Sequence, residues 1–333
     1  MVIIYHPDYL RHRQTLYHPE CPERLEGIVE FLKTSGMWEE VVYPETASVK
    51  DLGLVHSYAY IEKLKNFGEG PYDPDTYVRP ETFEIALHAV GGAVEAARRA
   101  MLGEKILALL RPPGHHATPE TAMGFCYFNN VAIAAKKLGK RTAILDIDVH
   151  HGNGTEEIFY SSPKVLYIST HQWGIFPGTG RVDSTGSGEG EGKTVNIPLP
   201  PGSGDATFEL AFNELVVPVI KEFRPEVLLV SLGCDAHYRD PLASLTLSSQ
   251  GYIKAAQRLL KIAKEFTAGG IAFMLEGGYD IPALSETVGG ITAIMKGKEV
   301  ELMFTKVSDT EGKGKAEVER AVEIQKEYWS SVG

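Results

Sequence analysis

Aspartate and histidine residues stand at the ends of apolar stretches in this sequence, where they could bind a metal ion. The segment 146–150 reads Asp-Ile-Asp-Val-His at the end of the apolar stretch 142–147. Alternate residues of an extended chain point to the same side, so Asp148 and His150 can bind one ion together. Asp235, at the end of another apolar stretch, can supply a third ligand and leave a position open for water, as in catalytic zinc sites. The alternative is that these carboxylates simply face water, although burying them without a partner would cost free energy.

The adjacent residues His115 and His116 are candidates for acid–base chemistry. They follow a Pro-Pro-Gly segment in a predicted loop that can direct both rings inward. Paired imidazoles suit proton transfer because their ordinary pKa lies near neutrality. Asp146 and Asn153 are candidates to orient these rings. Three other histidines have no comparable surroundings, and we interpret them as structural or surface residues: His56, His88 and His237.

Aromatic residues beside glycines form a third group. Tyr279 follows two glycines, which let the backbone approach a site closely. Its phenol could donate a hydrogen bond to a developing oxyanion. Phe125 and Phe176 lie in glycine-containing loops and could form the walls of a slot for an aliphatic chain. The alternative is that both rings only anchor their loops.

The sequence pattern predicts that parallel strands alternating with helices position these residues. Six apolar, β-branched stretches predict buried strands at residues 2–5, 106–110, 142–147, 165–169, 227–232 and 271–275. Helical patterns between and beside them predict helices at residues 23–34, 81–102, 131–138, 205–223, 249–265 and 281–295. Near-continuous hydrophobicity is typical of a parallel sheet covered on both faces. Ligands of such sheets bind beyond the carboxyl ends of the strands, so five strands would deliver the candidate residues to one edge.

These patterns predict an α/β fold with one large domain over residues 1–333. The glycine-rich segment 185–193 is predicted to be a surface loop. A polar hinge at 307–316 precedes a charged segment, 317–329, which we expect to be a solvated outer helix.

Composition narrows the classes of function. The chain has 333 residues and a formal net charge of −11, which disfavours direct binding to nucleic acid and favours cationic ligands such as lysine-rich segments or polyamines. Its three cysteines are far apart in the sequence, which predicts a reducing compartment. No apolar run reaches the roughly 18 residues of a membrane span, and the N-terminus carries no secretion signal. We therefore expect a soluble, cytoplasmic protein without membrane contact; its oligomeric state is not predicted.

Seven short segments, in order along the chain, resemble the zinc-dependent histone deacetylase family. The resemblance includes its class II-like bacterial and archaeal deacetylases, acetoin-utilization-type proteins and acetylpolyamine amidohydrolases. The segments are HPECPERL (18–25), RPPGHHA (111–117), GFCYFNN (124–130), DIDVHHGNG (146–154), FPGTG (176–180), DAHYRDPL (235–242) and LEGGYD (275–280). The resemblance implies a three-layer fold like that of arginases and deacetylases, and residues after about 300 lie outside it.

The resemblance also implies a role for each matching residue. Three of them would bind zinc: Asp148, His150 and Asp235. His116 would be the general base and then the acid that protonates the departing amine, held by Asn153. His115 would act as an electrostatic partner, with Asp146 behind it. Tyr279 would polarise the acetyl carbonyl.

A lysine tunnel and a second ion are implied in the same way. Phe125 and Phe176 would form the walls of the tunnel, and the carbonyl of Gly124 at its floor would accept the amide N–H. Arg24 would lie deep in the internal cavity used by acetate. A structural potassium ion would lie near five residues: Asp146, Asp148, His150, Ser169 and Thr170.

The sequence departs from parts of the family at two informative positions. Asn153 stands where nuclear class I enzymes carry Asp, as in the class II-like branch, and Tyr279 is kept where a weakly active branch has His. We therefore predict a metal-dependent amidohydrolase that acts on acetyl-lysine in proteins, with acetylpolyamines or other small acetylated amines as the alternative substrates. Two carboxylates and one imidazole are a hard ligand set, which would also suit Fe(II) or Co(II).

Three other functions compete with this prediction. A binuclear manganese ureohydrolase could share the fold, but it needs more clustered aspartates than this sequence supplies. A non-catalytic acetyl-lysine binder is disfavoured by the intact His-His-Tyr set. A cysteine hydrolase would have to use Cys126 or Cys234, which stand in no recognisable catalytic pattern.

Overall fold

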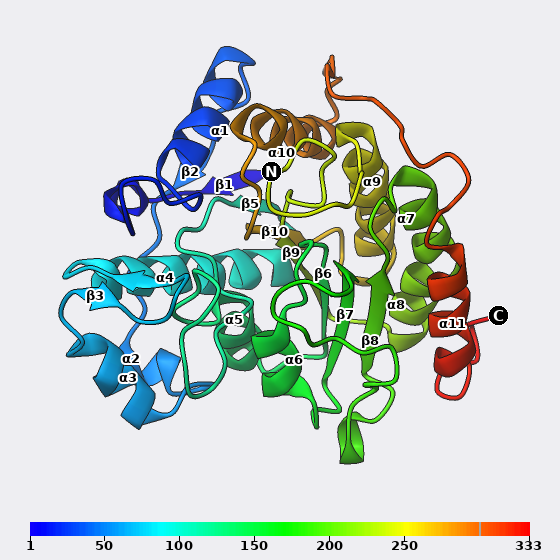
Figure 1. Cartoon of the computed structure of the whole chain (residues 1–333), viewed down its shortest axis with the longest axis horizontal. Coiled ribbons are helices and arrows are strands. Elements are labelled where there is room, and N and C mark those ends of the chain that lie inside the picture. The colour runs from blue at the N-terminus through cyan, green and yellow to red at the C-terminus, as the bar shows by residue number, and fades with distance from the viewer. Residues whose placement is uncertain (300) are drawn as a thin grey trace.

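A parallel sheet forms the centre of the molecule (Figure 1). The computed structural model describes residues 1–299 and 301–333. The sheet has eight strands in the order β2-β1-β5-β10-β9-β6-β7-β8, and every neighbouring pair is parallel. In chain order they are β1 (Val2–Ile4), β2 (Val41–Val42), β5 (Lys105–Ala108), β6 (Thr142–Asp146), β7 (Val165–Gln172), β8 (Thr194–Leu199), β9 (Val227–Leu232) and β10 (Ile271–Leu275). The continuous apolar stretches in the sequence therefore do form parallel strands.

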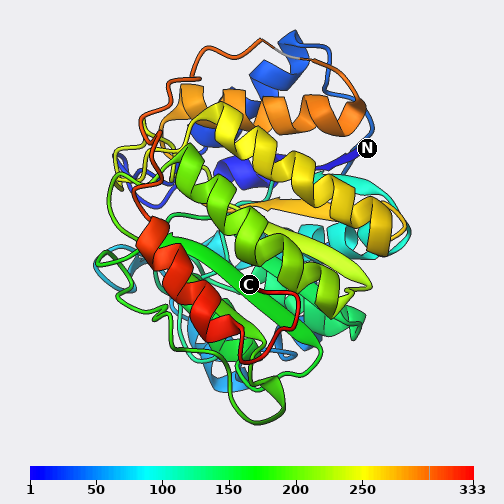
Figure 2. The ribbon, with the colours of Figure 1, turned by 90° about the vertical axis from the view of Figure 1, so that its right-hand side faces the viewer.

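Helices cover both faces of this sheet and complete three layers. One face is covered by α4 (Thr82–Met101), α5 (Asn130–Leu138) and α6 (Asn153–Phe159). The other face is covered by α1 (Glu23–Thr34), α7 (Asp205–Ala211), α8 (Val217–Phe223), α9 (Ser249–Phe266), α10 (Ile281–Lys296) and α11 (Lys315–Gln325). Figure 2 shows α9, α7, α8 and α11 side by side in front of the sheet. The predicted α/β class with helices on both faces is confirmed.

The structure also contains shorter helices and strands outside the three layers, and the sequence patterns did not predict them. They are the 3-10 helix η1 (Pro7–Arg11), the helices α2 (Val49–Leu52) and α3 (Tyr58–Lys65), and the antiparallel pair β3 (Gly70–Pro71) and β4 (Tyr77–Val78). Most are too short for a periodic signal. Strand β8 was also missed, because Thr194 and Asn196 interrupt its apolar run and Pro198 disfavours a strand. The single helix predicted at 205–223 is divided by a π-helical turn, Phe212–Val216.

Residues of the candidate motifs also cap two helices, which fixes the loops that carry them. The Asn129 side chain accepts a hydrogen bond from Ala132 N at the start of α5, and Gly139 ends that helix in the left-handed conformation. Asp280 accepts a hydrogen bond from Ala283 N at the start of α10. Such caps typically contribute about 1 kcal/mol to the free energy of unfolding. The chain thus enters each helix at a defined residue next to the edge of the sheet.

The C-terminal segment differs from its prediction as a solvated outer helix. Val318 and Ala321 of α11 are buried in the main core, and Trp329 just beyond the helix is only 4% exposed. The Trp329 indole N–H donates to the carbonyl of Gly192 at 3.0 Å. The charged residues of this helix lie on its outer face, while apolar residues at helical spacing pack inward. The prediction was therefore wrong for the inner face.

Among the described residues, none of the helices combines the length and the apolar character that a membrane crossing requires.

Truncating Trp329 tests the contribution of this packing. We expect Trp329→Ala to lower the free energy of unfolding by about 3–5 kcal/mol, because a large buried side chain leaves a cavity. Urea denaturation of the purified variant measures the change. Tyr17→Ala is the control, since Tyr17 is 92% exposed and its loss should change stability by less than about 0.5 kcal/mol. Equal stabilities of the two variants would contradict the packing described for the C-terminal segment.

Candidate active site

A pocket of about 170 Å³ lies beyond the carboxyl ends of the central strands. Strand register places the end of β6 at the centre, because Asp146 pairs with Ser231 of β9 on one side and Ser169 of β7 on the other. The residues that line the pocket are Asp75, Pro113, His115, His116, Gly124, Phe125, His150, Phe176, Leu242, Gly277 and Tyr279. Seven of them were candidates from the sequence, so the fold brings the predicted residues together.

Of the three predicted metal ligands, His150 lines this pocket and the two aspartates lie next to His150. Potential ligand atoms of Asp148, His150 and Asp235 all lie within 4.8 Å of one another. The His150 Nδ1 atom is 3.2 Å from Asp148 Oδ1 and 3.2 Å from Asp235 Oδ2. Backbone N–H groups fix both carboxylates, because Gly277 N donates to Asp148 Oδ2 and Val149 N donates to Asp235 Oδ1, each at 2.8 Å. The group is thus a preorganised, buried set of two carboxylates and one imidazole.

Glycines make room for these carboxylates. A Cβ atom at Gly277 would overlap with Oδ2 of both Asp148 and Asp235, and one at Gly233 would overlap with Oδ2 of Asp148. Only a residue without a side chain lets the β9 and β10 ends approach the acidic pair this closely. The glycines of the 233–235 and 275–280 segments therefore serve the geometry of the cluster.

The pKa values of the two buried carboxyl groups are shifted in opposite directions. Burial and the charge of Asp148 raise the pKa of Asp235 to about 7. Burial also disfavours the charged form of Asp148, but His115 and His150 hold the pKa of this carboxyl far below its ordinary value. Two carboxylates so close together repel each other unless a cation lies between them. The three ligands therefore fit a divalent cation, and their types suit zinc. Gly233 and Gly277, which make room for the carboxylates, are called the cradle below.

The two adjacent histidines are held differently. The His115 Nδ1 atom is 3.0 Å from Asp146 Oδ2, and the His116 Nδ1 atom is 2.8 Å from Asn153 Oδ1. Their ring centroids are 3.9 Å apart. Because an amide oxygen can only accept, His116 donates through Nδ1 and keeps Nε2 free to take a proton.

The pKa values of these histidines move in opposite directions. Burial alone would lower the pKa of His115, but the carboxylates of Asp146 and Asp148 raise it to about 10. Burial and the nearby charges of His115 and His150 lower the pKa of His116 well below its ordinary value. His115 is therefore a cation at neutral pH and His116 a neutral base. Pairs of groups whose pKa values are pushed apart are typical of acid–base sites.

Tyr279 also lines the pocket, and its loop is held by Asp240. Tyr279 N donates to Asp240 Oδ2 at 2.6 Å. Burial raises the pKa of the phenol well above its ordinary value, so the hydroxyl stays protonated at neutral pH. It is therefore available as a hydrogen-bond donor inside the pocket.

Two phenylalanines form walls of the pocket. The Phe176 ring lies 5.0 Å from the ring of His116, and the Phe125 ring lies 5.9 Å from that of Tyr279. Gly124 lies between them with φ of +56°, and a Cβ atom there would meet the His116 ring at 2.6 Å. A slot with aromatic sides and a glycine beside the histidine accepts a narrow aliphatic group.

Arg24 lies behind the pocket instead of lining it. Its guanidinium is buried and donates to the carbonyl of Gly278 at 2.6 Å, and its Cζ atom is 5.0 Å from the Tyr279 ring. It also pairs with the buried carboxylate of Glu20 at 3.1 Å. Glu20 in turn pairs with Arg111, and the two arginines overcome the effect of burial and lower its pKa to about 2. The predicted link of Arg24 to an acetate cavity stays a prediction.

Among the residues predicted to lie near a potassium ion, Asp146 at the end of β6 pairs with Ser169 of β7. Thr170 Oγ1 is buried and has no hydrogen-bond partner. Ser169 Oγ is 2.9 Å from His171 Nδ1. A buried hydroxyl without a partner calls for an explanation, and a bound ion is one. The potassium site stays a prediction.

Glu276 is a residue of this site that the sequence reasoning missed. Its buried carboxylate accepts hydrogen bonds from Gly114 N at 2.7 Å and from Ser231 Oγ at 3.1 Å. It thus ties the histidine loop to β9 and β10. A signal was available, because an acid directly after the buried strand 271–275 requires a partner.

His151 and His171 were also missed, and they hold the loop that carries Phe176. His151 Nδ1 is 2.8 Å from Thr179 Oγ1, and His171 Nε2 is 2.9 Å from the carbonyl of Gly180. Both histidines are buried. Neither contact could be found from the sequence, since the partners lie in a loop without regular structure.

Comparison with known proteins agrees with this geometry. A family model described as a histone deacetylase domain matches residues 18–295. The chain is 40% identical to a probable deacetylase of Archaeoglobus fulgidus over 98% of both chains. It is 41% identical to a probable deacetylase of Methanothermobacter thermautotrophicus, over 90% of this chain and 92% of the relative. The structure is similar to a crystal structure of the HDA15 HD domain, with a TM-score of 0.91 and 31% identity over 99% of this chain and 95% of that one.

An added methyl group at Gly277 tests whether the cradle is needed. We expect Gly277→Ala to abolish tight binding of one divalent ion per chain, because its Cβ atom would displace a carboxylate oxygen of Asp148 and of Asp235. Elemental analysis after dialysis measures the bound metal. Gly139→Ala is the control, since that position has φ of +62° and nothing within 4 Å of a Cβ atom. Full metal content in Gly277→Ala would show that the cradle holds no ion.

Proposed function

The chain belongs to the histone deacetylase family, and from this premise we propose that it is a zinc-dependent deacetylase of acetyl-lysine in proteins. One observation carries the proposal. A largely buried two-carboxylate, one-imidazole cluster adjoins the pocket that His116 and Tyr279 line. Such a set supplies a metal site, a base and an oxyanion donor, which are the parts that amide hydrolysis needs.

Asp148, His150 and Asp235 would hold the ion, and Fe(II) or Co(II) are the alternatives that the hard ligand set admits. A bound zinc ion would polarise the acetamide carbonyl and make a water molecule more acidic. Backbone donors already orient both carboxylates, so the ligands need little rearrangement to bind. A potassium ion bound beside Thr170 would have a structural role.

His116 is the residue that would move protons. Its Nε2 atom takes a proton from the attacking water while Nδ1–H stays bonded to Asn153. The low pKa that burial and His115 impose keeps His116 neutral until negative charge develops nearby. His116 then gives its proton to the amine nitrogen as the C–N bond breaks. The net reaction consumes one water and releases acetate and a free amine.

Tyr279 would stabilise the charge that forms on the carbonyl oxygen. Its hydroxyl keeps its proton, because burial holds its pKa well above the ordinary value. Asp240 fixes the backbone from which the ring projects. A donor held in place in this way stabilises the oxyanion without reorganisation.

The shape and charge of the pocket support acetyl-lysine as the substrate. The walls formed by Phe125 and Phe176 suit a narrow aliphatic stem that ends in an acetamide. Asp75 lines the pocket, and the chain carries a net charge of −11, which attracts lysine-rich sequences. Small acetylated amines such as acetylpolyamines share the stem and the positive charge and are the alternative. The cytoplasmic location stays a prediction.

The competing functions receive less support. Burial raises the pKa values of the Cys126 and Cys234 thiols well above the ordinary value, which disfavours a thiolate nucleophile. A binuclear manganese site would need a second free set of ligands beside the first. The neighbouring group of His115, Cys126 and Glu276 is instead engaged with Asp146 and with backbone donors.

Substitution of the two reacting side chains tests the proposed mechanism. We expect His116→Ala to lower kcat by about 10²–10⁴-fold, because it removes the proton carrier. Tyr279→Phe should lower kcat by about 10²-fold by removing an oxyanion donor. Metal content should stay at the wild-type value in both, and Tyr77→Phe, outside the pocket, should keep full activity. Wild-type kcat in Tyr279→Phe would exclude its proposed role.

A comparison of substrates tests the second half of the proposal. We expect kcat/KM, measured by acetate release, to be higher for an acetyl-lysine peptide than for acetylputrescine or acetylspermidine. Added salt should lower kcat/KM for lysine-rich peptides, because it screens the attraction to the acidic surface. A preference of more than about tenfold for the acetylpolyamines would overturn the substrate assignment and leave the chemistry intact.

A further inference from the structure

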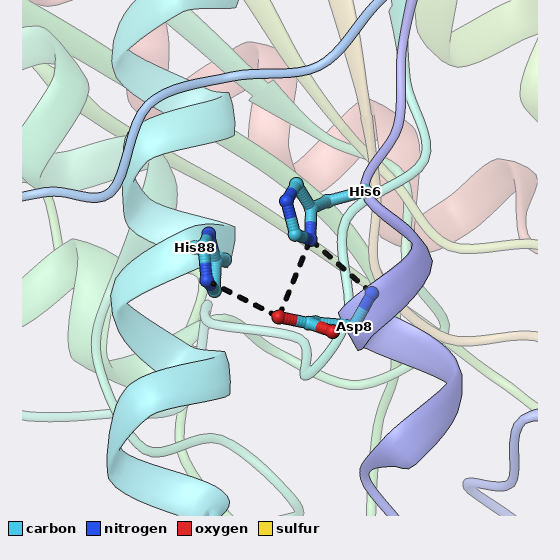
Figure 3. Close-up of side chains that lie close together, drawn as sticks. All are labelled: His6, Asp8 and His88. Carbon is cyan, nitrogen blue, oxygen red and sulfur yellow. Dashed lines mark hydrogen bonds and ion pairs between the residues drawn. The ribbon is translucent and has the colours of Figure 1, made fainter.

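A second group of potential metal ligands lies away from the pocket, at the start of the chain. Figure 3 shows His6, Asp8 and His88 facing one another. His6 follows β1, Asp8 belongs to η1, and His88 lies in the middle of α4. The three side chains are half-buried, with exposed fractions of 21%, 32% and 19%. None of them lines the pocket described above.

The distances within this group suit a single small cation. The Asp8 Oδ2 atom is 3.8 Å from His6 Nδ1 and 3.5 Å from His88 Nε2. All three ligand atoms lie within 4.8 Å of one another. Ligands bound at about 2.0–2.2 Å in a tetrahedron lie roughly 3.3–3.6 Å apart, so small side-chain rotations would complete the site.

Hydrogen bonds to neighbouring groups determine which ring nitrogens can bind an ion. Thr46 Oγ1 is 3.4 Å from His88 Nδ1; when Nδ1 donates to this hydroxyl, Nε2 is unprotonated and faces the carboxylate. His6 Nδ1 accepts a hydrogen bond from Asp8 N, so it is unprotonated as well. The rings are stacked with centroids 4.1 Å apart, which disfavours two charged imidazoles. His88 thus has a tautomer that offers a neutral nitrogen to a metal, and at His6 the ion would replace the hydrogen bond from Asp8 N.

We propose that His6, Asp8 and His88 form a second metal site, which binds one zinc-class divalent ion with two imidazoles, one carboxylate and water. Two nitrogens and one oxygen are ligands typical of zinc, cobalt and nickel. The ion would use Asp8 Oδ2 and leave Oδ1 with Arg11, whose Nη1 atom is 3.3 Å away. The sequence alone predicted no role for His88, because the fold alone brings it to His6 and Asp8.

The position of the site assigns it a structural role. The ion would join the β1–η1 junction to α4, which are otherwise linked here by the hydrogen bond from Tyr9 Oη to the carbonyl of His88 at 3.0 Å. The carbonyl of Tyr9 accepts a hydrogen bond from Arg111, which pairs with Glu20 behind the pocket. Binding should therefore stabilise this corner of the fold without supplying a reacting group.

Metal titration of the full-length protein tests the site. Protein loaded with one equivalent of zinc is titrated with further ZnCl₂ by calorimetry, and bound zinc is counted by elemental analysis. We expect the wild type to bind a second ion and to gain thermal stability on binding. His88→Ala should weaken this second binding more than tenfold and remove the gain in Tm. Basal amide hydrolysis with one equivalent of zinc should not change.

Two further variants make the result decisive. Arg11→Ala removes a neighbour of Asp8 but no ligand, so it should keep the second ion. His6→Ala should lose it, with circular dichroism as a check because His6 also caps η1. If that variant is unfolded, His88→Ala decides, since its ring makes no backbone hydrogen bond among the described contacts. A wild type that binds one zinc only, or a second ion that survives His88→Ala, would overturn the proposal.

Discussion

The burial of two carboxylates side by side is the constraint on which the rest of the site depends. Asp148 and Asp235 lie at the ends of neighbouring parallel strands with almost no exposure to solvent. Their repulsion is moderated by His150, by His115 and by backbone donors, and it favours a bound cation. An arrangement of this kind is costly to fold, and a core that spans eight strands and two helical layers supplies the stability that it requires.

The chemistry around this acidic pair follows from how each neighbour is held. Asp146 raises the pKa of His115, while burial lowers the pKa of His116, whose Nδ1 donates to Asn153 and leaves Nε2 free. Glu276 joins the loop that carries His115 and His116 to the neighbouring strands. His151 holds the loop that carries Phe176. Reacting groups come from strand ends and tight loops, and each is fixed by a second buried group, which is typical of preorganised sites.

Much of this could be predicted from the sequence, and the failures have physical causes. The buried strands and long helices were predicted because their apolar patterns are continuous. The strand-end residues of the site were predicted because parallel strands bring their carboxyl ends to one edge, whereas Gly124 was expected only from the resemblance to the family. Glu276 and His171 were missed because their partners become neighbours only through the fold. The inner face of α11 was missed because its many charges conceal a narrow apolar stripe.

The proposed function requires one divalent cation between Asp148, His150 and Asp235. Anomalous X-ray diffraction from crystals of the purified protein, collected on both sides of the zinc absorption edge, tests it most directly. We expect a peak about 2.0–2.2 Å from a carboxylate oxygen of each aspartate and from Nδ1 of His150. A pocket without a peak in crystals grown with zinc, or a peak bound instead by His115, Cys126 and Glu276, would contradict it.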